Sequence, residues 1–382
     1  MGGPPRAGPP AVVPSVTEIS APAPIGVRRR PPLSDVLRWV FGAMLLFGLG
    51  YWLIGEAINE PSRFAQVTVI GFSNGMIYAL VALGYTLVYG IIELINFAHG
   101  DNFMLGTFQA ESIFADGSFQ IPLIFFTISI PLGTAVTVDS SGWEKAYAIG
   151  MAIILASLFC MVINVTIERI GYKPLRNQPR LAPLITAIGF SFILQGIGLA
   201  WKGEARIPVP QIIPNTPLIE IDGVVYYTVR DLMVLLITIP VLVMLTWLVS
   251  ATKPGKAMRA TAQDRDAAAM MGISVDRTIS FTFALGGAIA GAGGVIYALY
   301  IGTTYFQLGF RLGLIAFTAA VLGGIGNLTG AVLGGILIGL ISAYNDGFGD
   351  ARWTYTIIFT ILILILVFRP SGLLGERTPE GQ

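Results

Sequence analysis

Charged residues are scarce in this sequence, and so are histidine and cysteine. Asp, Glu, Lys and Arg make up 12% of the 382 residues, against about 25% in a typical soluble domain. The single histidine, His99, rules out any site with two histidine ligands, and the single cysteine, Cys160, rules out an intrachain disulfide. We therefore expect no metal site, and we expect most of the chain to require a solvent other than water.

Nucleotide-binding signals are also missing. The chain has no G-x-x-x-x-G-K-[ST] loop, which would hold the phosphates of a nucleotide. Its net charge of +1 gives no basis for binding nucleic acid. We accordingly expect a chain that is not an enzyme and carries no cofactor, and any ATP that it depends on would be bound by other subunits.

Long apolar segments occupy most of the sequence. A helix needs about 20 apolar residues to cross the hydrocarbon core of a bilayer. Ten segments fit a full or half crossing: 36–54, 67–89, 94–114, 147–167, 181–201, 232–249, 279–301, 312–325, 328–344 and 353–368. The 46 glycines suit this reading, because small residues let helix backbones approach closely in lipid. The sequence predicts an all-α polytopic membrane protein with about ten transmembrane or half-membrane helices.

The distribution of basic residues predicts the orientation. Cytoplasmic loops of membrane proteins carry an excess of Lys and Arg. With ten crossings, 16 of the 23 basic residues fall on the side that holds both termini and 7 on the other. Both termini are therefore expected in the cytoplasm.

The sequence also predicts the domain organisation. Residues 1–34 are rich in Pro, Gly and Ala and read as a disordered cytoplasmic tail that ends in the basic run Arg28, Arg29 and Arg30. Residues 35–370 form the transmembrane domain, with a cytoplasmic loop at 252–277 and an external insertion at 115–146, and residues 371–382 form a second cytoplasmic tail. Within the insertion, Pro122 and Pro131 interrupt the apolar stretch 121–138, which is expected to be interfacial or re-entrant.

A polar stretch at membrane depth runs from Glu93 to Asn102 and includes Asn96, His99 and Asp101. Ionisable groups in hydrocarbon usually face a cavity or one another, so these three residues are candidates to line or gate a solute path. The alternative is a cytoplasmic turn in which Asn96 caps the following helix. Asn74, Asn164 and Gln195 are isolated amides in apolar segments. All three fit interhelical hydrogen bonds, with lining of the solute path as the alternative, and Asn74 and Gln195 are taken as further candidates for that path.

The loop 252–277 is expected to hold a short amphipathic helix. The loop contains an alanine-rich stretch, and Gly272 follows it. We expect Gly272 to end the helix, because glycine tolerates the left-handed conformation of a helix stop. Such a helix fits the surface of the membrane, held by its basic residues. It equally fits a groove on a cytoplasmic partner, where small side chains and methionines suit a close contact. The residues alone leave both readings open.

Several of these motifs together resemble the branched-chain amino acid ABC permease family. They are NGMIYALVALGYTLVYG at 74–90, INFAHGD at 95–101, IER at 167–169 with YKPLR at 172–176 and PRLAPL at 179–184, GKAMRA at 255–260 with the run 264–273, and AFTAAVLGGIGN at 316–327. They follow the family's order over most of residues 65–370. The Pro-rich tail and the long external stretch depart from the pattern.

The resemblance implies a subunit of an importer in the bacterial inner membrane that translocates branched-chain or other amino acids. Its expected partners are a homologous permease subunit, two cytoplasmic ATPase subunits, an extracytoplasmic solute-binding protein and membrane lipid. In that arrangement the loop after the sixth span is the helix that couples to the ATPase, and its residues here are Arg259, Asp264, Ala267, Ala268 and Gly272. Urea or short-chain amides are alternative solutes, and an ion-coupled secondary transporter is an alternative of another class.

Overall fold

The computed structural model describes residues 44, 47–48, 50–123, 126–133, 135–137, 139–176, 178–179, 181–221, 223–369 and 371–375. The chain divides into two units, Met1–Tyr51 and Trp52–Gln382. In the first unit the described residues are helical. The predicted tail 1–34, and much of the predicted span 36–54, lie outside the described residues.

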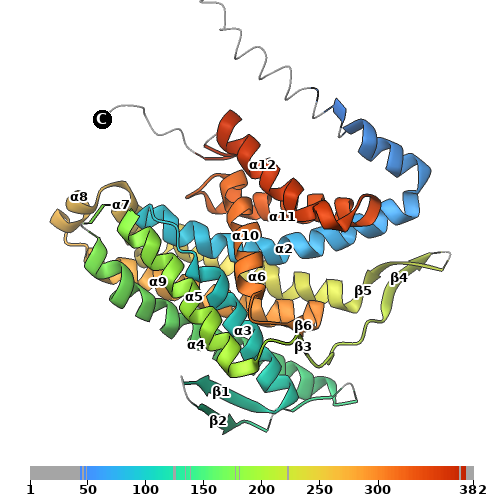
Figure 1. Cartoon of the computed structure of the whole chain (residues 1–382), viewed down its shortest axis with the longest axis horizontal. Helices are drawn as coiled ribbons and strands as arrows, with labels where there is room; N and C mark the ends of the chain where they lie inside the picture. The colour runs from blue at the N-terminus through green and yellow to red at the C-terminus, as the bar shows by residue number, and fades with distance from the viewer. Residues whose placement is uncertain are drawn as a thin grey trace, which may run out of the picture. The chain divides into compact units, whose positions relative to one another are not determined.

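The second unit is built mainly of helices (Figure 1). They are α2 (Pro61–Ile92), α3 (Ala98–Ala115), α4 (Gly142–Ile167), α5 (Leu181–Lys202), α6 (Val229–Ala251), α7 (Lys253–Gln263), α8 (Arg265–Met270), α9 (Val275–Ile301), α10 (Leu308–Gly323), α11 (Leu328–Phe348) and α12 (Thr354–Phe368). A π-helical turn, Glu168–Tyr172, and a 3-10 turn, Lys173–Leu175, extend α4, and a second 3-10 turn, Ala351–Trp353, precedes α12.

Seven helices in the described part of the chain are long and apolar enough to cross a membrane. They run over Pro61–Ile92, Gly142–Leu175, Leu181–Lys202, Val229–Ala251, Val275–Ile301, Leu328–Phe348 and Ala351–Phe368, and α10 is a shorter apolar helix. This confirms a polytopic helical membrane protein. The predicted segment 94–114 corresponds to α3, which begins at Ala98 and is not among these seven helices.

The strands are short and lie in three antiparallel pairs. β1 (Ser118–Pro122) pairs with β2 (Thr127–Pro131), β3 (Ile207–Pro208) with β6 (Thr303–Thr304), and β4 (Pro217–Ile221) with β5 (Val224–Thr228). The first pair includes residues 121–122 and 127–131 of the apolar stretch 121–138, for which we expected an interfacial or re-entrant segment. Pro122 and Pro131 each end a strand of this two-stranded ribbon, where a residue without a backbone donor is tolerated.

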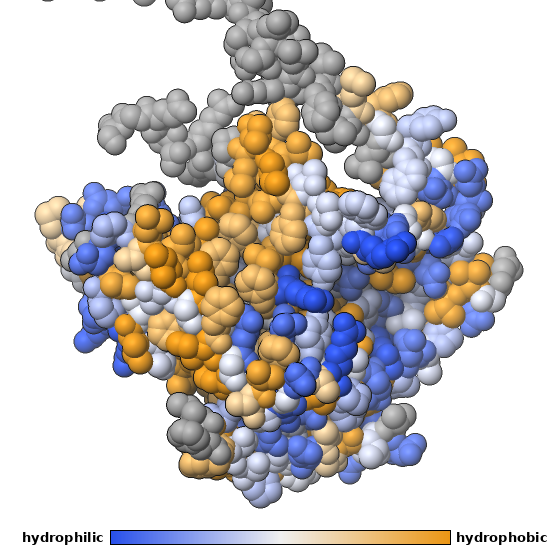
Figure 2. Space-filling view, viewed as in Figure 1, coloured by the Kyte–Doolittle hydropathy of each residue, from blue (hydrophilic) through white to orange (hydrophobic). Residues whose placement is uncertain are grey.

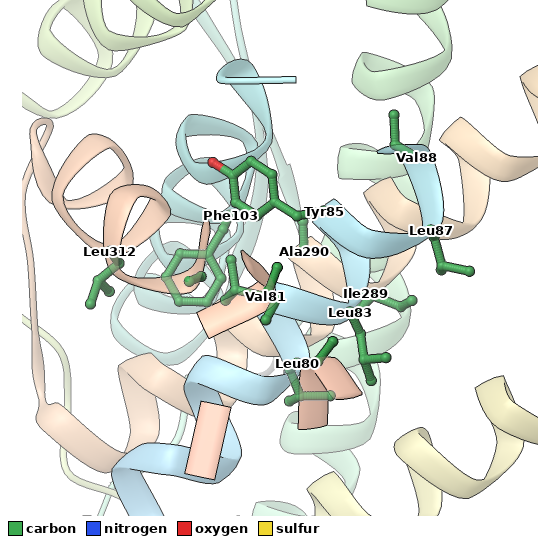
Figure 3. Packing of buried hydrophobic residues seen from close by; sticks show 14 of the residues in the cluster. Leu80, Val81, Leu83, Tyr85, Leu87, Val88, Phe103, Ile289, Ala290 and Leu312 are labelled. Atoms are coloured by element: carbon green, nitrogen blue, oxygen red, sulfur yellow. The ribbon is translucent and has the colours of Figure 1, made fainter. Parts of the chain in front are cut away.

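The core lies between α2, α3 and α9. Figure 3 shows Leu80, Val81 and Leu83 of α2 beside Phe103 of α3 and the Ile289–Ala290 stretch of α9. The helices differ sharply in how much of their apolar sequence is enclosed. In the most apolar stretch of α2, 83% of the residues are buried, against 11% in the span that contains α12.

The outer helices α4, α5, α6 and α12 expose large apolar side chains. Examples are Leu158, Phe192, Trp247 and Leu366, each more than 45% exposed. Hydrophobic residues accordingly cover a broad area of the face seen in Figure 2. An apolar surface of this extent is stable in lipid and not in water.

Glycines set how closely the inner helices approach. A Cβ atom at Gly75 of α2 would lie 2.7 Å from the Ile336 Cα atom of α11, and one at Gly106 of α3 would lie 3.0 Å from the Gly291 Cα atom of α9. Such backbone-to-backbone contacts allow only glycine at these crossings.

Helices α10 and α11 meet at a glycine-rich break. Gly324 and Gly326 have φ angles of 110° and 91°, and Asn327 caps α11 by accepting a hydrogen bond from the Gly330 amide at 2.9 Å.

Candidate functional site

Helix α3 carries the polar stretch, and every residue from Ala98 to Phe114 is buried. The helix follows an irregular segment that begins at Glu93, whose φ of 55° ends α2 in the left-handed conformation. The residue at the N-cap position of α3 is Phe97, and no side chain caps the helix. The alternative in which Asn96 caps α3 is therefore wrong.

The Asn96 side chain instead reaches across to α4. Its amide donates to the Asn164 side-chain oxygen at 3.3 Å, and the Asn164 amide donates to the Phe283 carbonyl of α9 at 2.7 Å. The two amides thus join the start of α3, α4 and α9. This is the interhelical bonding expected of Asn164. Asn74 takes no part in it and lies partly exposed on α2.

His99 is fully buried and fixed by its neighbours. The Tyr85 ring meets the imidazole nearly edge-on at a centroid distance of 4.8 Å. Gly84 lies so close that a Cβ atom there would overlap the Nε2 and Cε1 atoms of the imidazole. Neither ring nitrogen has a hydrogen-bond partner of ordinary geometry among the described residues. His99 is thus held by packing.

Asp101 connects α3 to α5. One carboxylate oxygen accepts hydrogen bonds from the Ser191 hydroxyl and, at 3.5 Å, from the Gln195 amide. The other has no partner in the described part of the chain. The structure therefore brings together two of the predicted residues, Asp101 and Gln195. Ser191 was missed, although its spacing of four from Gln195 places both on one helical face.

A second buried carboxylate, Asp231, was also missed by the sequence analysis. It stands in the first turn of α6 and accepts hydrogen bonds from the Ser73 hydroxyl of α2 at 2.9 Å and the Tyr300 hydroxyl of α9 at 3.0 Å. Its other oxygen accepts from the Thr228 amide and hydroxyl. The available signal was the pair Thr228 and Asp231, which form a capping box at the start of a span.

The polar residues of α3 lie in a close-packed interior. At Gly313 of α10, a Cβ atom would lie 3.1 Å from the Gly100 Cα atom and 2.8 Å from the Tyr85 hydroxyl. Asn96, Asp101 and Gly100 thus connect α3 or its start to α4, α5 and α10, respectively. Among the described residues no three His, Cys, Asp or Glu side chains converge on a point that could hold a metal ion.

The predicted amphipathic helix is two helices, α7 and α8, that meet at Asp264. The Asp264 carboxylate accepts hydrogen bonds from the Asp266 and Ala267 amides, both at 2.9 Å, so it caps α8. Arg259 lies in α7 and donates to the Val249 carbonyl of α6. The expectation of one continuous helix through this stretch is wrong, because an aspartate capping its own downstream amides competes with helix continuation.

The end of α8 has the geometry expected of Gly272. Its φ is 81°, its amide donates to the Ala269 carbonyl and the Ile273 amide donates to the Ala268 carbonyl, both at 3.0 Å. These two bonds form a Schellman stop. Ala268 is only 4% exposed, whereas Met270 and Met271 are each 83% exposed. The end of α8 therefore exposes two methionines, and Ala268 packs within the chain.

Comparison with known proteins matches the part of the chain that contains the apolar helices. The family described as branched-chain amino acid transport system, permease component, matches residues 67–367. The high-affinity branched-chain amino acid transport system permease protein BraD of Pseudomonas aeruginosa is 37% identical over 325 residues, which cover 84% of this chain and 99% of that protein.

More distant relatives carry similar names. The corresponding permease protein LivH of Escherichia coli is 34% identical over 321 residues, covering 83% of this chain and 97% of its own. The probable branched-chain amino acid transport permease protein LivH of Methanocaldococcus jannaschii is 26% identical over 327 residues, covering 80% and 90%. No match was found among solved structures.

Proposed function

We propose, because the chain belongs to the family of branched-chain amino acid transport system permease components, that it is the membrane-spanning subunit of an ATP-driven importer of branched-chain or related amino acids. The observation that carries the proposal is the family match over 67–367, which coincides with the helical, membrane-type part of the chain. ATP hydrolysis belongs to two partner ATPases. Solute capture outside belongs to a solute-binding protein.

The proposed orientation places both termini and the α7–α8 segment in the cytoplasm. The ends of α2, α4 and α6 and the starts of α3, α5 and α9 meet there. Arg265 of α8 donates to the Ile91 carbonyl of α2 at 3.1 Å, and Tyr172 after α4 donates to the Ile95 carbonyl at 3.2 Å. Basic residues collect at this end: Arg169, Lys173, Arg176, Lys253, Lys256, Arg259, Arg265 and Arg277. That enrichment is typical of the cytoplasmic side.

The α7–α8 segment is the proposed coupling element. Met270 and Met271 offer flexible apolar contacts to an ATPase groove. A displacement of this segment would pass through Arg265 to the end of α2, and from there to the start of α3. In this mechanism His99 and Asp101 position α3, so that the core moves as one body when the coupling element moves.

The proposed solute path runs between this chain and a second permease subunit. The interior of the chain is close-packed beside His99 and Asp101, so a path through one subunit would require separating its inner helices. A path between two subunits requires only that their facing surfaces part. Asn74, half-buried on α2, remains a candidate to line it.

Reconstitution tests this function. The permease, its partner ATPases and its binding protein in liposomes should take up labelled leucine when ATP is supplied, with labelled glutamate and urea as competing candidates. Uptake of urea in place of amino acids would overturn the substrate. Uptake driven by an ion gradient without ATP would overturn the mechanism.

A further inference from the structure

A cavity of about 270 Å³ opens at the proposed cytoplasmic end of the chain. Three segments distant in sequence enclose it: the α2–α3 connection at Glu93, the α4–α5 connection at Tyr172 and Arg176, and the coupling segment at Thr261 and Arg265. None of the five residues predicted for the solute path lines this cavity. It therefore requires an explanation of its own.

Each enclosing segment departs from regular helix at the cavity. Glu93 is the one residue other than glycine with positive φ in the described part of the chain. Tyr172 ends the π-helical turn that begins at Glu168, and the break between α7 and α8 at Asp264 separates two residues of the wall. Strained backbone and π-helical turns concentrate at functional sites, and here one of each lies beside the break between two helices.

The polar wall carries both signs of charge. Arg265 and Arg176 bring guanidinium groups, and Glu93 brings a carboxylate. The Nε atom of Arg176 has no hydrogen-bond partner in the described part of the chain, although the group pairs with Glu168 and Asp276. The Thr261 hydroxyl, in a residue only 1% exposed, also lacks a partner there. Buried polar atoms without partners are unusual in proteins, and both of these belong to residues that line one cavity.

The rest of the wall is apolar and comes from Ile91, Ile92, Leu94 and Pro183. Sites for drug-sized ligands usually enclose about 300–1,000 Å³, so 270 Å³ suits a smaller molecule. Two guanidinium groups fit a carboxylate, Glu93 fits an ammonium group, and the apolar wall fits a short hydrocarbon side chain.

We propose that this cavity is a binding site for a free α-amino acid with a short apolar side chain, reached from the cytoplasm. Its carboxylate would bind Arg265 and Arg176, its ammonium group Glu93, and its side chain the wall at Ile92 and Leu94. The proposal rests on the proposed function for its orientation. It adds a second solute site, on the inner side, to the transport activity.

Occupancy of this site would regulate the importer. The ligand contacts the coupling segment and the α2–α3 connection at once, so it favours the conformation in which they lie together. A ligand that prefers one conformation shifts the population toward it. Amino acid accumulated in the cytoplasm would therefore hold the coupling segment in place and slow ATP hydrolysis.

The test uses the permease–ATPase complex in membrane discs, without binding protein, in a Cys160→Ser background. Ala262→Cys places a thiol in the cavity wall, and Ser274→Cys places a matched exposed thiol before α9, outside it. Leucine at ten times its dissociation constant should slow labelling at position 262 about tenfold, by mass action, and leave position 274 unchanged. Glucose should protect neither.

Two outcomes overturn the proposal. Labelling at 262 that leucine does not slow shows that no amino acid binds there. Labelling at 262 that is blocked before leucine is added, and restored when the ATPases are removed, shows that an ATPase segment fills the cavity. If uptake in the full transporter proceeds normally in either case, the transport function stands and only this site is rejected.

Two variants separate binding from a structural effect. Arg265→Gln removes a charged donor and should weaken leucine protection about tenfold or more. Thr261→Val removes a hydroxyl that contacts no ligand group in the proposal, at nearly constant volume, and should weaken protection less. Arg277→Gln removes an exposed arginine at the same end of the chain, outside the cavity, and should change nothing. Equal protection in all three would overturn the assignment of residues.

Discussion

Gly84 of α2 faces the imidazole of His99 so closely that a Cβ atom at position 84 would overlap the ring. The contact joins two buried helices, and the Tyr85 ring lies against the same imidazole. A histidine fixed in this way by a glycine and an aromatic ring holds the spacing between α2 and α3. We therefore regard His99 as a positioning residue.

Gly84→Ala is expected to destabilise the permease by about 1–3 kcal/mol, the usual cost of overpacking a filled core. The measurement is the unfolding temperature of the purified chain in detergent. Gly189→Ala on α5, where no atom lies within 4 Å of the new Cβ atom, is the control and should be neutral. Combining Gly84→Ala with His99→Ala should cost less than the sum of the two; strict additivity would contradict the contact.

Ser191→Ala should destabilise the chain by about 1–3 kcal/mol, because it leaves the buried Asp101 carboxylate with only the 3.5 Å bond from Gln195. In an Asp101→Asn background the same change should cost less, since the uncharged amide depends less on that donor. Ser250→Ala, at an exposed position on α6, is the control. Thermal unfolding and leucine uptake measured together would show whether the contact between Ser191 and Asp101 affects only the stability of the fold or also transport.

The orientation can be checked with impermeant thiol reagents in the Cys160→Ser background. A cysteine at Ala269 should react only from the cytoplasmic side, and one at Asn215 only from outside. Both positions are exposed, so a missing reaction cannot be assigned to burial. Labelling of the cysteine at Ala269 from outside would reverse the placement of α7 and α8. Labelling of the cysteine at Asn215 from the cytoplasm would reverse the placement of the connection between α5 and α6.

The sequence predicted the described spans well because hydropathy is a local property. Gly272 was also predictable, since a helix stop depends only on its own turn. Asn96 was not: its partner, Asn164, lies 68 residues away, and local spacing favoured a cap. The triad of Ser73, Asp231 and Tyr300 depends on how three helices are rotated about their axes, which neither hydropathy nor spacing fixes.

Gly272→Val tests the stop of α8. A β-branched residue at a φ of 81° costs about 1–2 kcal/mol, so the segment after Met270 should shift and solute-stimulated ATP hydrolysis should fall. Gly272→Asn should retain most activity, because asparagine tolerates this conformation. Equal activity in both variants would show that the stop does not matter for coupling.

The two exposed methionines at the end of α8 give the most direct test of the coupling proposal. Met270→Asp and Met271→Asp place charge where an apolar contact with an ATPase is proposed. Both side chains are 83% exposed, so neither change disturbs the packing of the permease itself. A bulky substitution at the buried Ala268 would disturb it. Burial of one methionine contributes about 1.5–3 kcal/mol. Both variants should therefore insert in the membrane normally but bind the ATPases more weakly and lose solute-stimulated hydrolysis together with uptake.

Ala269→Ser, which lies between Ala268 and Met270 and is exposed, is the matched control and should behave as the unmodified chain. The two readings of the loop 252–277 predict different results here. A helix held only on lipid headgroups needs no contact with an ATPase, so charge at 270 and 271 would leave hydrolysis unchanged. Normal transport by both aspartate variants, with the ATPases still bound, would establish that reading and remove α8 from the coupling mechanism.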